Sequence, residues 1–96
     1  MNVVRLLDEK RDLIVELAAK HGAANVRVFG SAARGDASAE SDLDLLVKMN
    51  PGRILFDLVG LWQDLEELLG CNVHVLTDGG VSPFLRDKIY SEARPL

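Results

Sequence analysis

Hydrophobic residues recur along this chain at two spacings, and these spacings predict its elements. A helical spacing runs from residue 3 to about residue 21, with Leu13 and Ile14 on its apolar face and acidic residues on the other. Gly22 follows as a C-terminal stop. Alternation of apolar and polar residues predicts strands over residues 25–29, 43–48 and 72–77.

The strongest helical pattern covers residues 54–69, and Gly70 marks its end. Its apolar stripe is broad, with Trp62 in the middle and Phe56 outside it. Trp62 is therefore expected in the core. The margin of the stripe, together with Phe56, has two interpretations: ordinary core packing, or part of a docking surface for a partner.

Ser82 and Pro83 predict the start of a last helix, because serine is a common N-cap and proline is tolerated at the first helical position. Pro95 is expected to end this helix. Its apolar residues are expected to pack back onto the sheet: Phe84, Leu85, Ile89 and Tyr90. The order of elements predicts one α/β (α+β) domain over residues 1–96, in which helices cover one face of a small mixed sheet.

The candidate chemistry lies between the first two predicted strands. Gly30-Ser31 follows the first strand, and ten residues separate it from Asp42-x-Asp44, which opens the second. Alternate side chains of a strand share a face, so the two carboxylates point the same way. Such a pair is repulsive, and a divalent cation with a nucleotide triphosphate would relieve the repulsion. The Gly-Ser turn offers backbone N–H groups for the phosphates.

Two residues of the turn also allow plainer interpretations. Residues 31–34 are expected to form one helical turn, and Ser31 alone is most simply the cap of that turn. The paired aspartates at a matching distance favour phosphate binding instead. Arg34 either contacts a phosphate or pairs with Asp36 or Glu40 in a surface salt bridge.

Composition narrows the function classes. With 96 residues, of which 48% are hydrophobic and 27% charged, the chain is expected to form one globular domain. A formal net charge of −4 argues against binding nucleic acid through broad electrostatics. Cys71 is the only cysteine, so a buried, inert thiol is expected. The sequence has neither a secretory pattern nor an apolar run of the roughly 20 residues that span a bilayer, which predicts a cytoplasmic location.

Gly30-Ser31, ten residues and Asp42-x-Asp44 together resemble the signature of the nucleotidyltransferase superfamily that includes DNA polymerase beta. The short chain and the form Gly-Ser-x-Ala-Arg-Gly narrow the resemblance to the minimal nucleotidyltransferase (MNT) family, commonly encoded in prokaryotes beside a HEPN-domain partner as a toxin–antitoxin pair. The resemblance implies an antitoxin that transfers AMP from ATP, with Mg²⁺ (or Mn²⁺) held by Asp42 and Asp44, to a tyrosine hydroxyl of the HEPN-domain toxin. It also implies that Gly30, Ser31 and Arg34 bind the nucleotide.

His74 departs from that pattern. The superfamily implies a third carboxylate on the next strand of the sheet, and this chain has His74 at the expected place. Imidazole is a poor magnesium ligand and suits manganese or zinc better. A neutral His74 could act as general base for the incoming hydroxyl, or it could mark a site that has lost activity. The nearest substitute carboxylates are Asp36, Asp57 and Asp78, and neither Asp36 nor Asp78 is well placed in the sequence.

Three functions therefore stay open, in order of preference. The first is the adenylyl-transferring antitoxin, which the intact pair Asp42 and Asp44 favours. The second is a non-catalytic module that neutralises its partner by docking alone, which His74 favours. The third is transfer to a small molecule such as an aminoglycoside, which is disfavoured because the chain has no second domain to hold such an acceptor.

Overall fold

The computed structural model of the chain describes residues 3–35 and 42–96. Its helices are α1 (Val3–Lys20), α2 (Ser31–Arg34), α3 (Leu55–Leu69) and α4 (Arg86–Glu92). Its strands are β1 (Ala23–Phe29), β2 (Leu43–Met49), β3 (Val73–Thr77) and β4 (Arg94–Pro95), and a short 3-10 helix, η1 (Asp78–Gly80), follows β3. Every element predicted from the sequence is present, and β4 is an addition. Among these residues, none of the helices has the length and apolar character of a membrane span.

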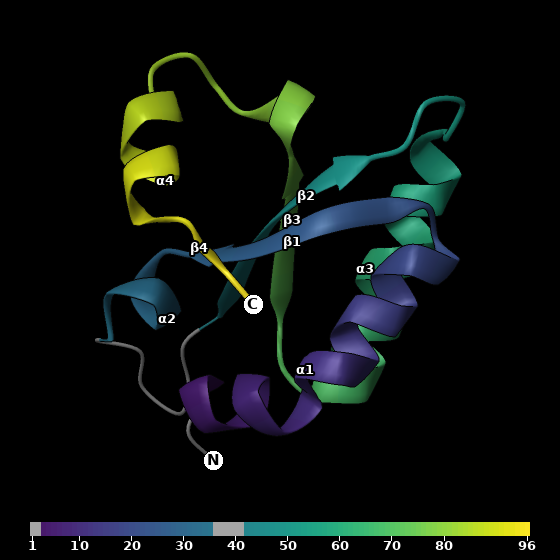
Figure 1. Cartoon of the computed structure of the whole chain (residues 1–96), viewed down its shortest axis with the longest axis horizontal. Coiled ribbons are helices and arrows are strands. Elements are labelled where there is room, and N and C mark those ends of the chain that lie inside the picture. Colours follow the sequence, from purple (N-terminus) through teal and green to yellow (C-terminus); the bar gives the residue numbers. More distant parts are fainter. Residues whose placement is uncertain (1–2, 36–41) are drawn as a thin grey trace.

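The described strands form one sheet in the order β3-β2-β1-β4 (Figure 1). β1 runs antiparallel to both β2 and β4, whereas β2 and β3 are parallel and α3 crosses over between them. The sheet is therefore mixed, as predicted. Its register places Asp44 of β2 opposite Phe29 of β1 and opposite His74 of β3.

The main hydrophobic core lies between the sheet and the helices α1 and α3, which share one side of the sheet in Figure 1. Strand side chains alternate between faces, so every second residue of β2 points into this core. The largest fully buried side chains are Ile14, Leu43, Leu45, Leu46, Leu61, Leu65, Val47 and Val73. Of these, Leu46 belongs to the other face of the sheet.

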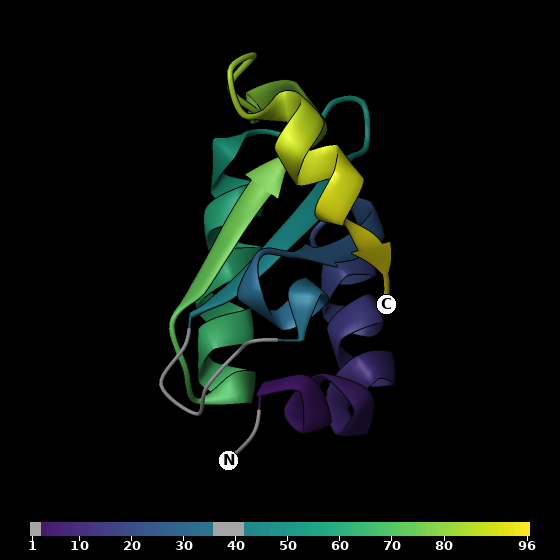
Figure 2. The same ribbon diagram turned by 90° about the vertical axis from the view of Figure 1, so that its left-hand side faces the viewer.

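α4 packs on the face of the sheet opposite to α1 and α3, and Figure 2 shows it lying across the near side of the strands. The expectation that helices cover only one face was therefore wrong for α4. The cause lies in the strands: Phe29 and Leu46 point away from the main core, and Ile89 of α4 buries them in a second, smaller cluster.

Trp62 lies at the surface, with 45% of its area exposed, so the prediction that it belongs to the core was wrong. The buried stripe of α3 is narrow and consists of Leu61, Leu65 and Leu69, at a spacing of one helical turn. Trp62 is rotated away from that stripe. On α1, Leu13 is likewise 44% exposed, contrary to expectation.

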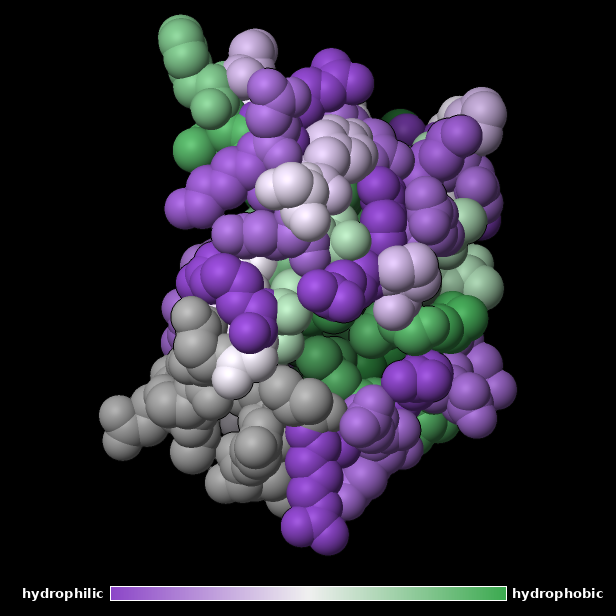
Figure 3. Space-filling model, turned by 60° about the vertical axis from the view of Figure 1, so that its left-hand side comes forward, coloured by the Kyte–Doolittle hydropathy of each residue, from purple (hydrophilic) through white to green (hydrophobic). Residues whose placement is uncertain are grey.

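α4 begins at Arg86, later than Ser82-Pro83 predicted. The residues before it form a turn, in which Phe84 is 97% exposed and Leu85 is 52% exposed. Neither packs onto the sheet as expected, and the buried cluster on this face consists instead of Phe29, Leu46 and Ile89. A hydrophobic projection stands at the top of the molecule in Figure 3, over the segment that leads into α4.

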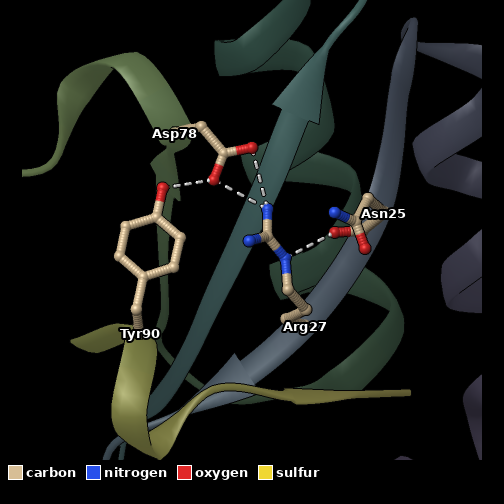
Figure 4. A network of polar contacts seen from close by, with 4 residues as sticks. All are labelled: Asn25, Arg27, Asp78 and Tyr90. Atoms are coloured by element: carbon tan, nitrogen blue, oxygen red, sulfur yellow. Dashed lines mark hydrogen bonds and ion pairs between the residues drawn. The ribbon is translucent and has the colours of Figure 1, made fainter. Parts of the chain in front are cut away.

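Asp78 joins three elements through its carboxylate (Figure 4). It accepts two hydrogen bonds of 2.9 Å from the guanidinium of Arg27 on β1 and one of 2.7 Å from the hydroxyl of Tyr90 on α4. Arg27 also donates to the carbonyl of Asn25, which lies in a bulge of β1 with a φ of 51°. Burial raises the pKa of Asp78, but the hydrogen bonds from Tyr90 and Arg27 outweigh it and hold the pKa below its ordinary value.

Asp78→Asn is expected to lower the free energy of unfolding by about 2 kcal/mol, because the guanidinium of Arg27 loses its carboxylate. Tyr90→Phe removes one hydrogen bond and should cost about 1 kcal/mol. Since folding lowers the pKa of Asp78 from 3.8, its stabilisation is complete above that value and is lost as the pH falls through the folded pKa. Denaturant unfolding should therefore show a difference between wild type and Asp78→Asn that shrinks below about pH 4.

Candidate active site

The Gly-Ser turn begins at Gly30, which ends β1 and caps α2. Gly30 has φ 73° and ψ −150°, a backbone conformation that favours glycine. A Cβ atom built on Gly30 would collide with Oδ2 of Asp44, so the absence of a side chain lets the turn lie directly against that carboxylate. Ser31 is the first residue of α2 rather than its cap, which removes the plainer interpretation of this serine.

Asp42, Asp44 and His74 come together at the start of the parallel strands. Asp44 lies beside His74 in the register of β2 and β3, and Nε2 of His74 is 3.0 Å from Oδ2 of Asp42. An ionised carboxylate only accepts hydrogen bonds, so a neutral His74 donates through Nε2 and keeps a lone pair on Nδ1. About half of each side chain of this Asp42–His74 pair is exposed to solvent.

Asp44 is the more buried carboxylate of the pair, and its surroundings disfavour its charge. Burial raises its pKa above the ordinary value, and the negative charges of Asp42 and Glu92 raise it further. His74 and Arg34 lower the pKa but do not cancel the rise. A cation placed between Asp42 and Asp44 would therefore remove an electrostatic penalty that the chain itself leaves in place.

Arg34 forms an ion pair that the sequence did not predict. Its Nη1 donates a hydrogen bond of 3.0 Å to Oε1 of Glu92 on α4. The predicted partners Asp36 and Glu40 lie outside the described residues. The ion pair between Arg34 and Glu92 joins the Gly-Ser turn to the last helix.

A cleft with a volume of about 520 Å³ connects the Gly-Ser turn with Asp44, His74 and Glu92, and Asp42 adjoins it through its contact with His74. Its floor comes from the second face of the sheet, one wall from α2 and the other from α4. Its lining residues are Phe29, Gly30, Ser31, Arg34, Asp44, His74, Leu76, Leu85, Lys88, Ile89 and Glu92. Figure 3 views the side of the molecule that carries α2 and α4, where hydrophilic side chains predominate.

The sequence analysis did not predict that α4 forms one wall of the cleft. Leu85, Lys88 and Glu92 line the cleft, and their spacing of three and four residues puts them on one side of a helix. That spacing was visible in the sequence. The spacing alone does not indicate that these residues face the cleft, because the sequence does not determine which face of the sheet α4 covers.

The remaining titratable residues considered lie elsewhere. The chain's other histidine, His21, is 2.6 Å from Asp64 and links α1 to α3. Asp57 accepts a hydrogen bond of 2.9 Å from the backbone N–H of Ile54 at the start of α3, which follows the end of β2, whereas Asp42 precedes the start of β2. Cys71 is only partly buried, and burial, followed by the charges of Asp42 and Glu66, raises the pKa of its thiol.

The donor set fits a divalent cation that arrives with phosphate. In the described part of the chain, no three side chains of His, Cys, Asp or Glu are placed to hold a metal ion on their own. Magnesium, however, is usually bound by one or two carboxylates together with substrate phosphates and water. Asp42 and Asp44 beside the Gly-Ser turn provide that chemistry, with phosphate oxygens and water left to complete the shell.

Comparison with known proteins identifies the family. Residues 10–96 match the family model of the nucleotidyltransferase domain. A protein of Methanocaldococcus jannaschii named "Putative protein adenylyltransferase MJ0435" is 41% identical over 87 residues, which cover 91% of this chain and 94% of that protein. "Protein adenylyltransferase MntA" of Thermococcus cleftensis is 35% identical over 80 residues, covering 78% of this chain and 81% of that protein.

Solved structures agree on the fold. One described as "putative minimal nucleotidyltransferase" superposes with a TM-score of 0.88 at 46% identity, covering 100% of this chain and 97% of that one. A toxin–antitoxin structure with AMP-PNP superposes with a TM-score of 0.75 at 20% identity, covering 88% of this chain and 69% of that one. The chain belongs to the nucleotidyltransferase domain family, and its fold is that of a minimal nucleotidyltransferase.

Proposed function

We propose that this chain is an antitoxin that transfers AMP from ATP to a hydroxyl, on a tyrosine, of a HEPN-domain toxin. The observation that carries the proposal is the direct packing of Gly30 against the carboxylate of Asp44 in a cleft that also contains Arg34. The proposal assigns phosphate binding to the turn and metal binding to the carboxylate, and their direct contact supports that assignment. The names of the relatives as protein adenylyltransferases support the choice of reaction, and the toxin–antitoxin neighbours support the choice of partner.

Each residue of the site has a task in this proposal. The backbone of Gly30 and Ser31, with the guanidinium of Arg34, binds the phosphates of ATP. Asp42 and Asp44 hold Mg²⁺ or Mn²⁺, which would neutralise charge on the triphosphate and favour deprotonation of the acceptor. The Arg34–Glu92 ion pair keeps the guanidinium at the wall of the cleft.

The transfer itself is an in-line displacement at the α-phosphorus. The acceptor oxygen forms a new bond to that phosphorus, the bond to the oxygen bridging the α- and β-phosphates breaks, and pyrophosphate leaves with the electron pair. His74 takes the acceptor's proton on Nδ1, because Nε2 is directed to Asp42. The half-exposed imidazole then releases this proton to solvent.

A second function is favoured by one observation. His74 occupies the place of a carboxylate and is hydrogen-bonded to Asp42, so the site has one acidic ligand fewer than the superfamily implies. A chain with a weakened site can still neutralise a toxin by binding it. This alternative predicts protection of cells without modification of the toxin.

The deciding experiment mixes the chain with a HEPN-domain toxin, ATP and magnesium, and weighs both proteins by intact-mass spectrometry. The proposal expects the toxin to gain the mass of AMP, on a tyrosine located by peptide sequencing. A toxin that is neutralised in cells but never gains mass would support the binding module instead.

His74→Gln should lower the rate of transfer roughly 100-fold while the KM for ATP changes little, because the general base is lost and the phosphate-binding groups stay. His74→Asp is the informative companion. A rate above wild type for His74→Asp would show that the position calls for a metal ligand and would contradict the role of base.

A further inference from the structure

Lys88 lines the cleft on the side formed by α4, and contacts of neighbouring residues in α4 fix the position of its backbone. The next residue, Ile89, is buried in the second core cluster, and Glu92, one turn later, pairs with Arg34 across the cleft. The hydroxyl of Ser91 donates a 2.8 Å hydrogen bond to the carbonyl of Lys88. The start of the Lys88 side chain is therefore fixed relative to Asp44 and the Gly-Ser turn, which line the same cleft.

Among the described residues, no acidic side chain forms an ion pair with Lys88. The cleft is lined by two carboxylates, Asp44 and Glu92, and by two permanent cations, Arg34 and Lys88. Glu92 is engaged by Arg34 at 3.0 Å. Among residues 3–35 and 42–96, no carboxylate forms an ion pair with the ammonium of Lys88. An ammonium on a flexible stem, facing a cleft for an anion, is a point charge suited to phosphate.

We propose that Lys88 binds the phosphates of ATP that leave as pyrophosphate; this inference rests on the proposed function. When the bond between the α-phosphorus and the bridging oxygen breaks, the electron pair stays on the oxygen of pyrophosphate. The ammonium of Lys88 stabilises that growing charge from the wall opposite the Gly-Ser turn.

Binding of nucleotide to the chain alone tests this role before any transfer occurs. Lys88→Met keeps the length and helix propensity of the side chain but removes its charge. Its dissociation constant for ATP with magnesium, measured by calorimetry, should rise roughly tenfold, as expected for a lost charge-assisted hydrogen bond, whereas that for AMP should stay unchanged. Lys88→Arg should recover most of the affinity for ATP.

Lys48→Met is the matched control, because it removes an equal charge from an exposed lysine on β2 outside the cleft. Unchanged binding of ATP by Lys88→Met would overturn the role of Lys88 and leave the proposed function standing. An equal loss for ATP and AMP would also overturn it, since the contact would then be to the α-phosphate. A wild-type chain that binds no ATP would overturn both proposals.

Discussion

Asp44→Asn is expected to abolish transfer of AMP, with a loss of roughly 10⁴-fold or more, because a neutral amide is a far weaker ligand for a divalent cation than a carboxylate. Asp42→Asn should lose transfer as well, and it additionally weakens the charge that orients His74. The measurement is the rate at which the partner gains the mass of AMP in the presence of ATP and magnesium.

Asp44→Asn should also stabilise the fold. A loss of transfer in this variant would therefore not be due to unfolding. Folding raises the pKa of Asp44 from 3.8, mainly through burial, so the wild-type chain loses stability as the pH rises from that value through the folded pKa. Asn never ionises and escapes this loss. Thermal unfolding should therefore find Asp44→Asn close to wild type below about pH 4 and more stable than wild type at neutral pH.

Asp12→Asn provides the control, since it makes the same chemical change on the exposed face of α1. It should leave both transfer and the pH dependence of unfolding unchanged. Transfer at the wild-type rate by Asp44→Asn would remove this carboxylate from the metal site, and with it the main support of the proposed mechanism. If the double variant at Asp42 and Asp44 still protects cells from the toxin, docking alone is sufficient for neutralisation.

The meeting of Gly30, Asp44 and His74 could be predicted from the sequence because it depends on local rules. Alternation along β2 decides which way Asp44 points, and a glycine at a strand end permits the close approach that the turn needs. The parallel register then places His74 beside Asp44, where the family pattern has a carboxylate. The contact of Gly30 with Asp44 thus follows from spacing, whereas the place of His74 was expected from the family resemblance.

The contribution of α4 to the cleft could not be predicted, because the spacing of hydrophobic residues does not determine on which face of the sheet a helix packs. The periodicity of α4 is compatible with packing on either face of the sheet, so neither the Arg34–Glu92 ion pair nor the place of Lys88 in the cleft could be derived. Trp62 shows the same limit, because a broad apolar stripe does not tell how much of it the core will cover. Phe84, at 97% exposure, is a still larger departure.

Gly30→Ala is expected to reduce transfer roughly 1000-fold, because either the turn or the carboxylate of Asp44 must move, and a displacement of about 1 Å alone costs roughly 100-fold. The new Cβ meets the end of the Asp44 side chain, which can rotate away. The cost in stability should therefore be only the backbone strain of a positive φ, about 1–2 kcal/mol. The substitution should therefore lower the rate of transfer much more than it lowers the stability of the fold.

Gly70→Ala separates strain from collision, because Gly70 has a φ of 67° and a Cβ added there would meet no atom within 4 Å. It should lose about 1 kcal/mol of stability and keep the wild-type rate of transfer. Unfolding curves and transfer rates of the two variants, measured side by side, show whether backbone strain or collision with Asp44 causes the loss of transfer. Equal rates for Gly30→Ala and Gly70→Ala would mean that contact between the turn and Asp44 is irrelevant to the reaction, because the collision is what distinguishes the two substitutions.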